Sequence, residues 1–475
     1  MTSSYHLIGI GGAGMSVVAQ LLKAEGFQVS GSDQQDSSTL QELLHVGIDA
    51  YFPHDPGHMP SGATVVLSSA IREDNPELLA ARTQGAPVIH RSEALARAAQ
   101  GKRFVAVAGA HGKTTTSAML ATALDASGCE PSFAIGGIVT AYATGAHIGA
   151  GDIFVAEADE SDGSFLNYEP TLAIVTNVEA DHLDHWGSQE AFEQGFVDFA
   201  MRVRKPGCLV ICVDDPGAAR LLERLRACGF GDAAALGSST QVATIGYGLS
   251  EKADIRITDL HLGQLGSSAV LRGNLPGFDG LATELSLQAV GQHNVLNATA
   301  AWVAGLCLGA APQSLAQGLH SFTGTARRFD VAGSVAGIRV IDDYAHHPTE
   351  VASLMRQARL AAGANRVLAV FQPHLFSRTK QFATQFAQAL SQADKVVLTD
   401  IYGAREDPIE GVSSHLIADQ LPGAQVIDDM FEAGDYLADL AQPSDIILTI
   451  GAGSITKVAP AILARLSKRR GEGLL

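Results

Sequence analysis

A glycine-rich loop that contains a lysine and two threonines stands between a predicted strand and a predicted helix. The apolar run Phe104–Ala108 predicts the strand, residues 114–124 predict the helix, and the loop reads Gly109-Ala110-His111-Gly112-Lys113-Thr114-Thr115. A phosphate is favoured there because unpaired amides point at it and the helix dipole is positive. Lys113 can reach the β- and γ-phosphates, and the Thr114 hydroxyl can ligate Mg²⁺. The pattern predicts nucleotide binding, and the alternative is an ordinary glycine turn before a helix.

Carboxylates and a histidine follow two further predicted strands. The acidic stretch Glu157–Asp162 comes directly after one strand, and the stretch Thr176–His185 begins at the end of another. Ligands bind at the carboxyl ends of strands in open parallel sheets. Glu157 could therefore hold a magnesium ion that neutralises phosphate charge, with His182 as a second ligand. The alternatives are a solvated acidic loop and a structural histidine.

A second glycine motif lies near the N-terminus. Residues Gly9–Gly14 fit the pattern G-x-G-x-x-G between a predicted strand and a helix, and Asp33 follows the next strand. Taken alone, this arrangement indicates NAD. The physical requirement is only a pyrophosphate at a helix N-terminus with a carboxylate nearby, and a UDP-sugar satisfies it equally well.

Three polar stretches lie in the last third of the chain, namely Arg327–Phe329, Asp342–Glu350 and Phe371–Thr379. An arginine among them could stabilise charge on a transferring phosphoryl group or grip a carboxylate. Each stretch alone could be a surface charge or a helix cap. Together they indicate a polar cleft.

Strand and helix signals alternate along most of the chain, which predicts parallel sheets with helices on their faces. We expect three α/β domains, at residues 1–102, 103–322 and 323–475. Residues 254–288 differ, because they alternate apolar and polar side chains and contain many glycines. This segment predicts antiparallel strands appended to the central parallel sheet.

The composition limits the possible partners. The chain has 475 residues, 46% of them hydrophobic, and a formal net charge of −18. An acidic protein lacks the basic field that attracts nucleic acid or an anionic membrane, although local amides can still bind one phosphate ligand. We see neither a signal peptide nor an apolar run long enough to span a membrane, so the expected location is the cytoplasm.

Taken together, these motifs resemble those of the Mur ligases of peptidoglycan synthesis. The similarity covers nearly the whole chain, and two of the stretches, Glu157–Phe165 and Asp342–Glu350, look like the branch that adds L-alanine. The resemblance rests on Gly9–Ser16, Gly109–Thr116, Glu157–Phe165, Glu179–Asp184, His293–Asn297, Arg327–Phe329, Asp342–Glu350 and Phe371–Thr379.

The resemblance implies a Rossmann-like UDP-substrate domain, a central P-loop ATPase domain and a Rossmann-like C-terminal domain. The lactyl carboxylate of UDP-N-acetylmuramate would take the γ-phosphate of ATP, and the amine of L-alanine would attack the acyl phosphate. Such a reaction needs ATP, Mg²⁺ and the two substrates, with no nucleic acid and no membrane as partners. We expect a monomer or a homodimer.

Carried over residue by residue, the resemblance implies roles for individual positions. The catalytic residues would be Lys113, Glu157, His182 and Arg328. ATP would be bound by Gly109, Ala110, His111, Gly112, Lys113, Thr114 and Thr115, together with His293, Asn297 and Arg328. The metal ligands would be Thr114, Glu157 and His182. The UDP-substrate would be bound by Gly11, Gly12, Ala13, Gly14, Met15, Ser16, Asp33 and Ser69, and the amino acid by Tyr344, His346 and Arg378.

The chain departs from the family pattern at two positions. Leu375 stands where many relatives have an arginine, and Ser454 where relatives commonly have an aspartate. The alternative within the family is a recycling ligase that attaches a preformed peptide to the same sugar nucleotide. From other classes, a non-catalytic nucleotide-binding regulator and a nicotinamide-dependent dehydrogenase remain, but a dehydrogenase would leave the Gly-Lys-Thr loop unexplained.

Overall fold

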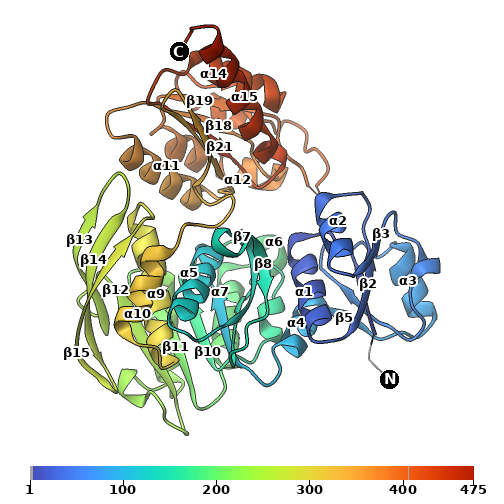
Figure 1. Cartoon of the computed structure of the whole chain (residues 1–475), viewed down its shortest axis with the longest axis vertical. Helices are drawn as coiled ribbons and strands as arrows, with labels where there is room; N and C mark the ends of the chain where they lie inside the picture. The colour runs from blue at the N-terminus through green and yellow to red at the C-terminus, as the bar shows by residue number, and fades with distance from the viewer. Residues whose placement is uncertain (1–3, 405) are drawn as a thin grey trace. The chain divides into compact units, whose positions relative to one another are not determined.

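The computed structural model describes residues 4–404 and 406–475, and the side chains of Ala13, Leu183 and Asp184 fall outside the description (Figure 1). Contacts divide the chain into two compact units. The first unit comprises the residues up to Leu260, Ser268–Leu287 and Val295–Phe322. The second comprises His261–Ser267, Gln288–Asn294 and Thr323–Leu475.

The N-terminal part of the first unit is a parallel sheet in the order β3-β2-β1-β4-β5. Its strands are β1 (Ser4–Ile8), β2 (Gln28–Ser32), β3 (Asp49–Tyr51), β4 (Thr64–Leu67) and β5 (Val88–His90). Its helices are α1 (Ala13–Ala24), α2 (Ser38–His45), α3 (Pro76–Thr83) and α4 (Arg91–Ala98), with the 3₁₀ turn η1 (Pro56–His58). This is the predicted alternation, because parallel neighbours require crossover connections.

The rest of the first unit is built on a larger sheet. The described strands follow the order β15-β14-β13-β12-β11-β10-β6-β9-β7-β8. They are β6 (Arg103–Ala108), β7 (Ser132–Val139), β8 (Thr144–His147), β9 (Ile153–Glu157), β10 (Leu172–Val175), β11 (Gly207–Cys212), β12 (Val242–Gly248), β13 (Ile255–Leu262), β14 (Ser267–Leu275) and β15 (Phe278–Leu287). Its helices are α5 (Lys113–Ala126), α6 (Leu183–Trp186), α7 (Gln189–Ala200), α8 (Pro216–Ala227), α9 (Gln292–Cys307) and α10 (Pro312–Ser321), with the turns η2 (Thr140–Tyr142), η3 (Ser164–Asn167) and η4 (Ala233–Ala235).

The last three strands of this sheet form a meander, as the alternating pattern of residues 254–288 predicts. Only residues 263–266 connect β13 to β14, and only residues 276–277 connect β14 to β15. Such short links join antiparallel strands, because a parallel crossover needs a dozen residues or more. By contrast, β12 and β13 pair in parallel, and the antiparallel hairpin β7–β8 was not predicted.

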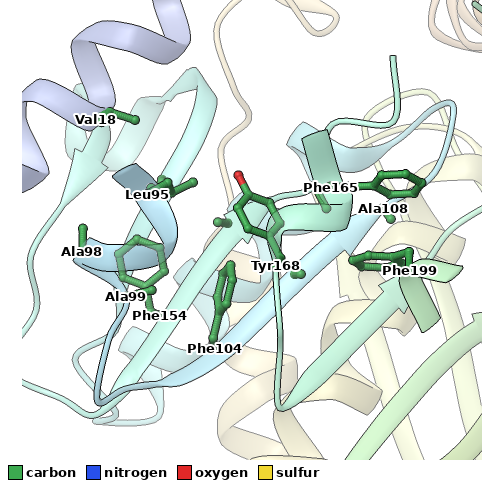
Figure 2. Packing of buried hydrophobic residues seen from close by; sticks show 14 of the residues in the cluster. Val18, Leu95, Ala98, Ala99, Phe104, Ala108, Phe154, Phe165, Tyr168 and Phe199 are labelled. Atoms are coloured by element: carbon green, nitrogen blue, oxygen red, sulfur yellow. The ribbon is translucent and has the colours of Figure 1, made fainter. Parts of the chain in front are cut away.

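One hydrophobic core runs through both parts of the first unit. It contains Val18 of α1 and Leu95 of α4 together with Phe104 of β6, and Figure 2 shows these side chains around Tyr168. The Phe165 ring stacks on Phe199 with 5.0 Å between centroids. Helix α1 also lies against β7 and β8 (Figure 1). The N-terminal sheet and the central sheet are therefore joined by shared apolar burial.

The second unit contains a sheet in the order β16-β17-β21-β18-β19-β20, with β16 antiparallel to β17 and the other pairs parallel. Its strands are β16 (Asp330–Val335), β17 (Ile338–Asp343), β18 (Val367–Phe371), β19 (Lys395–Leu398), β20 (Gln425–Val426) and β21 (Ile446–Ile450). Its helices are α11 (Pro348–Ala362), α12 (Phe376–Leu390), α13 (His415–Ala418), α14 (Met430–Leu440) and α15 (Val458–Gly471), with the turn η5 (Ser454–Lys457).

Alternate residues of these strands enter two separate cores. On β18, Val367, Ala369 and Phe371 pack with α11, α12 and α13, whereas Leu368 and Val370 pack with α14 and α15. This period of two places a helical layer on each face of the sheet. Among the described residues, no helix is long and apolar enough to cross a lipid bilayer.

The strand order of the central sheet brings three predicted motifs to the same edge. Strands β10, β6 and β9 are parallel neighbours. The segments that follow them begin at Thr176, Gly109 and Ala158, and each leaves its strand at the carboxyl end. Ligands of open parallel sheets bind at this edge.

Candidate functional site

The loop after β6 has the backbone geometry of a phosphate cradle. Gly109 has a φ of +137°, and a Cβ there would lie 2.1 Å from the Thr176 hydroxyl oxygen. Gly112 is the N-cap of α5 with a φ of +84°. No side chain of the described residues caps this helix end. Its first amides therefore remain available to a ligand.

Residues at the end of β10 hold the loop in this shape. The His111 amide donates to Asn177 Oδ1 at 3.0 Å, and Asn177 Nδ2 donates back to the His111 carbonyl at 2.8 Å. The Thr176 hydroxyl donates to the same carbonyl at 2.7 Å. His111 Nε2 also lies 3.2 Å from a carboxylate oxygen of Glu179. The loop is thus positioned by side chains of the segment that follows the neighbouring strand β10.

Lys113 forms a buried ion pair with Glu160. Its ammonium lies 2.8 Å and 2.9 Å from the two carboxylate oxygens, and it also donates to the Gly109 carbonyl at 2.7 Å. The Glu160 side chain is 1% exposed. Burial disfavours the charge of Lys113, but Glu160 and then Asp159 outweigh it and raise the pKa of the lysine. Burial also raises the pKa of Glu160 against the pull of Lys113, yet the short contact indicates an ionised pair.

Two of the three predicted metal ligands lie together. The Thr114 hydroxyl donates to Glu157 at 3.1 Å, and the other carboxylate oxygen of Glu157 accepts from the Gly136 amide at 2.7 Å. His182 lies against Asp181, with 3.5 Å between the ring Nε2 and a carboxylate oxygen. A hydroxyl and a carboxylate are the oxygen ligands that Mg²⁺ prefers, so the pair of Thr114 and Glu157 fits that ion.

The two residues expected near adenine belong to different units, because the division falls within α9. Asn297 lies against the loop, and a Cβ on Gly112 would be 2.8 Å from its Oδ1. His293 contacts the Ser353 hydroxyl of α11 at 3.1 Å. Burial, with Arg356 nearby, lowers the pKa of His293 to about 4. Asn297 therefore belongs to the unit that contains the glycine loop, and His293 to the unit that contains the C-terminal helices.

The N-terminal glycine motif forms an uncapped helix start. Gly12 is the N-cap of α1, without a side-chain cap among the described residues. Asp33 accepts the Gly11 amide at 2.9 Å. Ser16 and Met15 are buried in the first turns of α1. Ala13 begins α1, and its side chain falls outside the described residues.

The acidic stretch after β9 contacts three other segments of the first unit. Besides the pair of Glu160 with Lys113, Asp159 pairs with Arg91 at 2.5 Å. Asp162 accepts from the Ser69 hydroxyl at 2.7 Å. Of this stretch only Glu157 was predicted to have a role, and Arg91 was not predicted at all. The run of acidic residues is visible in the sequence, but the residues that pair with it are distant in the chain, so their pairing has no local pattern.

In the second unit, the predicted arginine and amino-acid residues form a cluster. The Tyr344 ring has the guanidinium of Arg327 4.6 Å and that of Arg328 5.3 Å from its centroid. His346 Nδ1 lies 3.0 Å from the Tyr344 carbonyl. Arg378 joins the cluster through His374, with 3.5 Å between Nη1 and the ring Nδ1. His374 belongs to a predicted motif but was given no role, and the structure places it between His346 and Arg378.

Carboxylates orient the backbone and side chains of this cluster. Glu350 accepts the His346 amide at 3.0 Å and lies 3.7 Å from Arg328. Asp343 accepts the amides of Phe329 and Ala345 at 2.7 Å and 2.8 Å. Burial raises the pKa of Asp343 to about 6, although Arg328 opposes this shift.

The two departures from the family pattern occupy different surroundings. Leu375 has a φ of +70° and donates its amide to the Tyr402 carbonyl at 2.9 Å. A positive φ is costly for a leucine and tends to be retained near functional sites. The Ser454 hydroxyl accepts from the side-chain amide of Gln372 at 3.3 Å, and Ser454 begins η5.

Three family descriptions match consecutive parts of the chain. Residues 4–103 match "Mur ligase family, catalytic domain", residues 107–305 match "Mur ligase middle domain", and residues 327–453 match "Mur ligase, glutamate ligase domain". The chain is 49% identical over 471 residues to the UDP-N-acetylmuramate–L-alanine ligase of Kineococcus radiotolerans, covering 98% of this chain and 96% of that protein. It is also 49% identical to the enzyme of that name from Paenarthrobacter aurescens, covering 97% and 96% of the two chains.

Solved structures show the same fold. The crystal structure of the UDP-N-acetylmuramate–alanine ligase MurC of Thermotoga maritima superposes with a TM-score of 0.79 at 27% identity, covering 99% of both chains. A murein peptide ligase of Psychrobacter arcticus superposes with a TM-score of 0.72 at 22% identity over 98% of both chains. The second similarity concerns the fold alone.

Replacing Glu160 tests the buried ion pair. In Glu160→Ala, the Lys113 charge would stay buried without its carboxylate, and we expect the free energy of unfolding to fall by about 3 kcal/mol. Glu160→Gln keeps an acceptor for the ammonium and should cost less. Urea unfolding measures the free energy of unfolding of both variants. Glu223→Ala, at an exposed position, is the control. Equal stability of Glu160→Ala and the control would contradict the inferred pair.

His346 makes the second unit sensitive to acid. Burial lowers the pKa of His346 to about 4, with Glu350 opposing and Arg378 adding to the shift. At pH values between about 4 and 6.5, the His346 imidazole takes up a proton in the unfolded chain but stays neutral in the folded chain. This group therefore does not lower the free energy of unfolding above about pH 6.5, but it lowers it progressively as the pH falls from there toward 4.

We expect the acid-induced loss of stability between pH 7 and pH 4.5 to be smaller in His346→Gln than in the unaltered chain, by roughly 2 kcal/mol. Urea midpoints measured across this range provide the test. The exposed His415 supplies the control His415→Gln, which should follow the unaltered chain. Parallel pH profiles for all three proteins would show that His346 is not buried in its neutral form.

Proposed function

This chain belongs to the Mur ligase family, and on that basis we propose that it joins L-alanine to the lactyl carboxylate of UDP-N-acetylmuramate at the expense of ATP. The observation that carries the proposal is the near full-length similarity to ligases that bear this substrate pair in their names. We further propose the domain limits 1–102 for the UDP-substrate domain, 103–322 for the ATP-binding domain and 323–475 for the C-terminal ligase domain.

The reaction proceeds in two transfers. A lactyl carboxylate oxygen attacks the γ-phosphorus of ATP, the bond to the bridging oxygen breaks, and ADP leaves. The amine of L-alanine then attacks the carbonyl carbon of the acyl phosphate, phosphate leaves, and the amine loses a proton. Neither step needs a nucleophile from the protein, so catalysis consists of positioning and charge neutralisation.

The residues at the carboxyl edge of the central sheet suit the first transfer. Lys113 supplies a positive charge in the loop Gly109–Thr115, and the uncapped first amides of α5 add further donors. Asn297 and His293 would lie near the adenine, and Arg328 would reach the phosphates. Thr114 and Glu157, with His182, would hold Mg²⁺. The ion would supply positive charge that offsets the charge developing on the phosphoryl oxygens.

The remaining proposed residues bind the acceptor and the amine donor. Residues Gly11–Ser16, with Asp33 and Ser69, would bind the UDP part of the sugar nucleotide. Tyr344, His346 and Arg378 would seat L-alanine, since a buried guanidinium and polar side chains suit an amino-acid carboxylate. The reaction consumes ATP, and we place it in the cytoplasm. A recycling ligase that accepts a preformed peptide is the alternative, and the choice of amine donor separates the two.

Phosphate release measures the proposed reaction directly. With ATP and Mg²⁺ present, we expect release only when UDP-N-acetylmuramate and L-alanine are both added, because the acyl phosphate needs both partners to turn over. Glycine, L-serine and a preformed tripeptide, the kind of donor that a recycling ligase would accept, serve as comparison donors. Rapid release with the tripeptide but not with L-alanine would favour the recycling ligase, and binding without any release would favour a regulator.

Lys113→Ala should nearly abolish turnover, with kcat lowered by about 100-fold or more, because it removes a cation that faces the transferred phosphoryl group. Binding of the sugar nucleotide should be nearly unchanged. The exposed change Lys252→Ala controls for loss of a positive charge elsewhere in the first unit. Activity that survives in Lys113→Ala would show that the glycine loop does not bind the reacting phosphates.

A further inference from the structure

Arg91 lies at the start of a helix that packs beside the N-terminal glycine motif. It is the first residue of α4, which contacts α1. Its side chain is 26% exposed, so most of the guanidinium's surroundings are protein. Placing a cation this deeply is costly unless charges or hydrogen bonds compensate. The burial of the Arg91 charge therefore indicates a role other than keeping the protein surface soluble.

The guanidinium approaches the backbone at Gly14. A Cβ added there would lie 2.5 Å from Nη1 and 3.5 Å from Cζ of Arg91. Gly14 lies inside the first turn of α1, where a helical backbone suits any residue. Its lack of a side chain is thus explained by the close approach of Arg91 to the uncapped start of α1. The last glycine of the G-x-G-x-x-G pattern makes room for this approach.

The other end of the guanidinium is held by the acidic stretch after β9. Arg91 Nη2 donates to Asp159 Oδ2 at 2.5 Å, and Asp159 Oδ1 accepts the Ser161 amide at 3.1 Å. Burial opposes the charge of Arg91, but Asp159 and then Asp162 outweigh it and raise the pKa of the guanidinium. Burial likewise opposes ionisation of Asp159, yet Arg91 and Lys113 lower its pKa to about 2. Both groups are therefore charged.

We propose that Arg91 is a further substrate-binding residue, which contacts the diphosphate of the sugar nucleotide through Nη1 while Asp159 holds Nη2 in place. The proposal rests on the proposed function, since it takes the start of α1 as the diphosphate site. A guanidinium carries its donors in a rigid fork, so it can serve a carboxylate and a phosphate at the same time. Asp159 is a positioning residue that acts through Arg91.

The same arrangement occurs at the neighbouring residue of the acidic stretch. Glu160 pairs with Lys113 at the ATP loop, and Asp159 pairs with Arg91 at the loop of α1. Each cation lies beside the start of a helix that follows a glycine motif. Two consecutive carboxylates thus orient the cations of two phosphate sites, and the second pairing supports a phosphate as the ligand of Arg91.

Calorimetric titration of the full chain with UDP and with uridine tests the proposal. For Arg91→Met we expect the Kd of UDP to rise by about 10- to 100-fold, the typical value of a lost charge-assisted hydrogen bond. The Kd of uridine, which lacks the diphosphate, should stay unchanged, as should that of ATP. Arg97→Met is the matched control, because Arg97 is exposed on the same helix. In turnover, Arg91→Met should raise the KM for the sugar nucleotide and leave kcat nearly unchanged.

Three further variants distinguish a direct contact with the diphosphate from a general loss of folding. Arg91→Lys keeps the charge but not the fork, and its Kd for UDP should lie between those of the unaltered chain and Arg91→Met. Asp159→Asn should weaken UDP binding only while Arg91 is present, so the double variant should match Arg91→Met.

Equal loss of uridine and UDP binding in Arg91→Met, or no loss of UDP binding, would overturn the role of Arg91 while the proposed function stands. Turnover with the proposed substrates but without an effect of Arg91 on UDP binding would lead to the same conclusion. An unaltered chain that binds neither UDP nor the sugar nucleotide would instead contradict the proposed function itself.

Discussion

The buried contact between Lys113 and Glu160 is the interaction on which the central site depends. A glycine loop that is proposed to bind phosphates needs a cation, and without a bound ligand that cation must remain charged inside the protein. The carboxylate of Glu160, which is 1% exposed, meets this need. An unpaired buried ammonium would lose its proton or would move out toward solvent. Since Glu160 follows β9 and Lys113 begins α5, the pair also ties two neighbouring strands' loops together. The phosphate cradle and the carboxylate that could hold the metal are thereby built from one connected network.

Much of this arrangement could be predicted from local sequence, and some could not. The strand Phe104–Ala108, the glycine loop and the following helix were predicted because their signals lie within about twenty consecutive residues. The pairing of Arg91 with Asp159 could not be predicted, because 68 positions separate them and neither the strand order nor the helix packing that joins them has a local signal. The roles proposed for the site residues remain predictions.

The second unit shows a different use of charge. Its cations lie beside the Tyr344 ring as well as near carboxylates, and a guanidinium over an aromatic face remains a donor to other groups. Asp343 accepts the Phe329 amide and so shapes the segment that carries Arg328, whose charge in turn opposes the rise in the pKa of Asp343. Positive φ values at Arg327 and Phe329 show that this segment is held in a costly conformation. Asp343 accepts a hydrogen bond from the Phe329 amide and Asp330 accepts one from the Arg327 amide, and these bonds offset the cost of that backbone.

Net charge explains why the cations are paired so closely. The chain carries a formal charge of −18, while the proposed ligands, namely ATP, a sugar nucleotide and an acyl phosphate, are all anions. Long-range attraction cannot gather these ligands, so binding must come from donors within hydrogen-bond reach. A cation in an acidic protein attracts carboxylates, and a carboxylate placed on the phosphate side of the cation would exclude the ligand. Placing the carboxylates on a short segment after β9 lets each one hold a cation in place. Glu160 contacts the Lys113 ammonium, which also donates to the Gly109 carbonyl. Asp159 holds Nη2 of the Arg91 guanidinium.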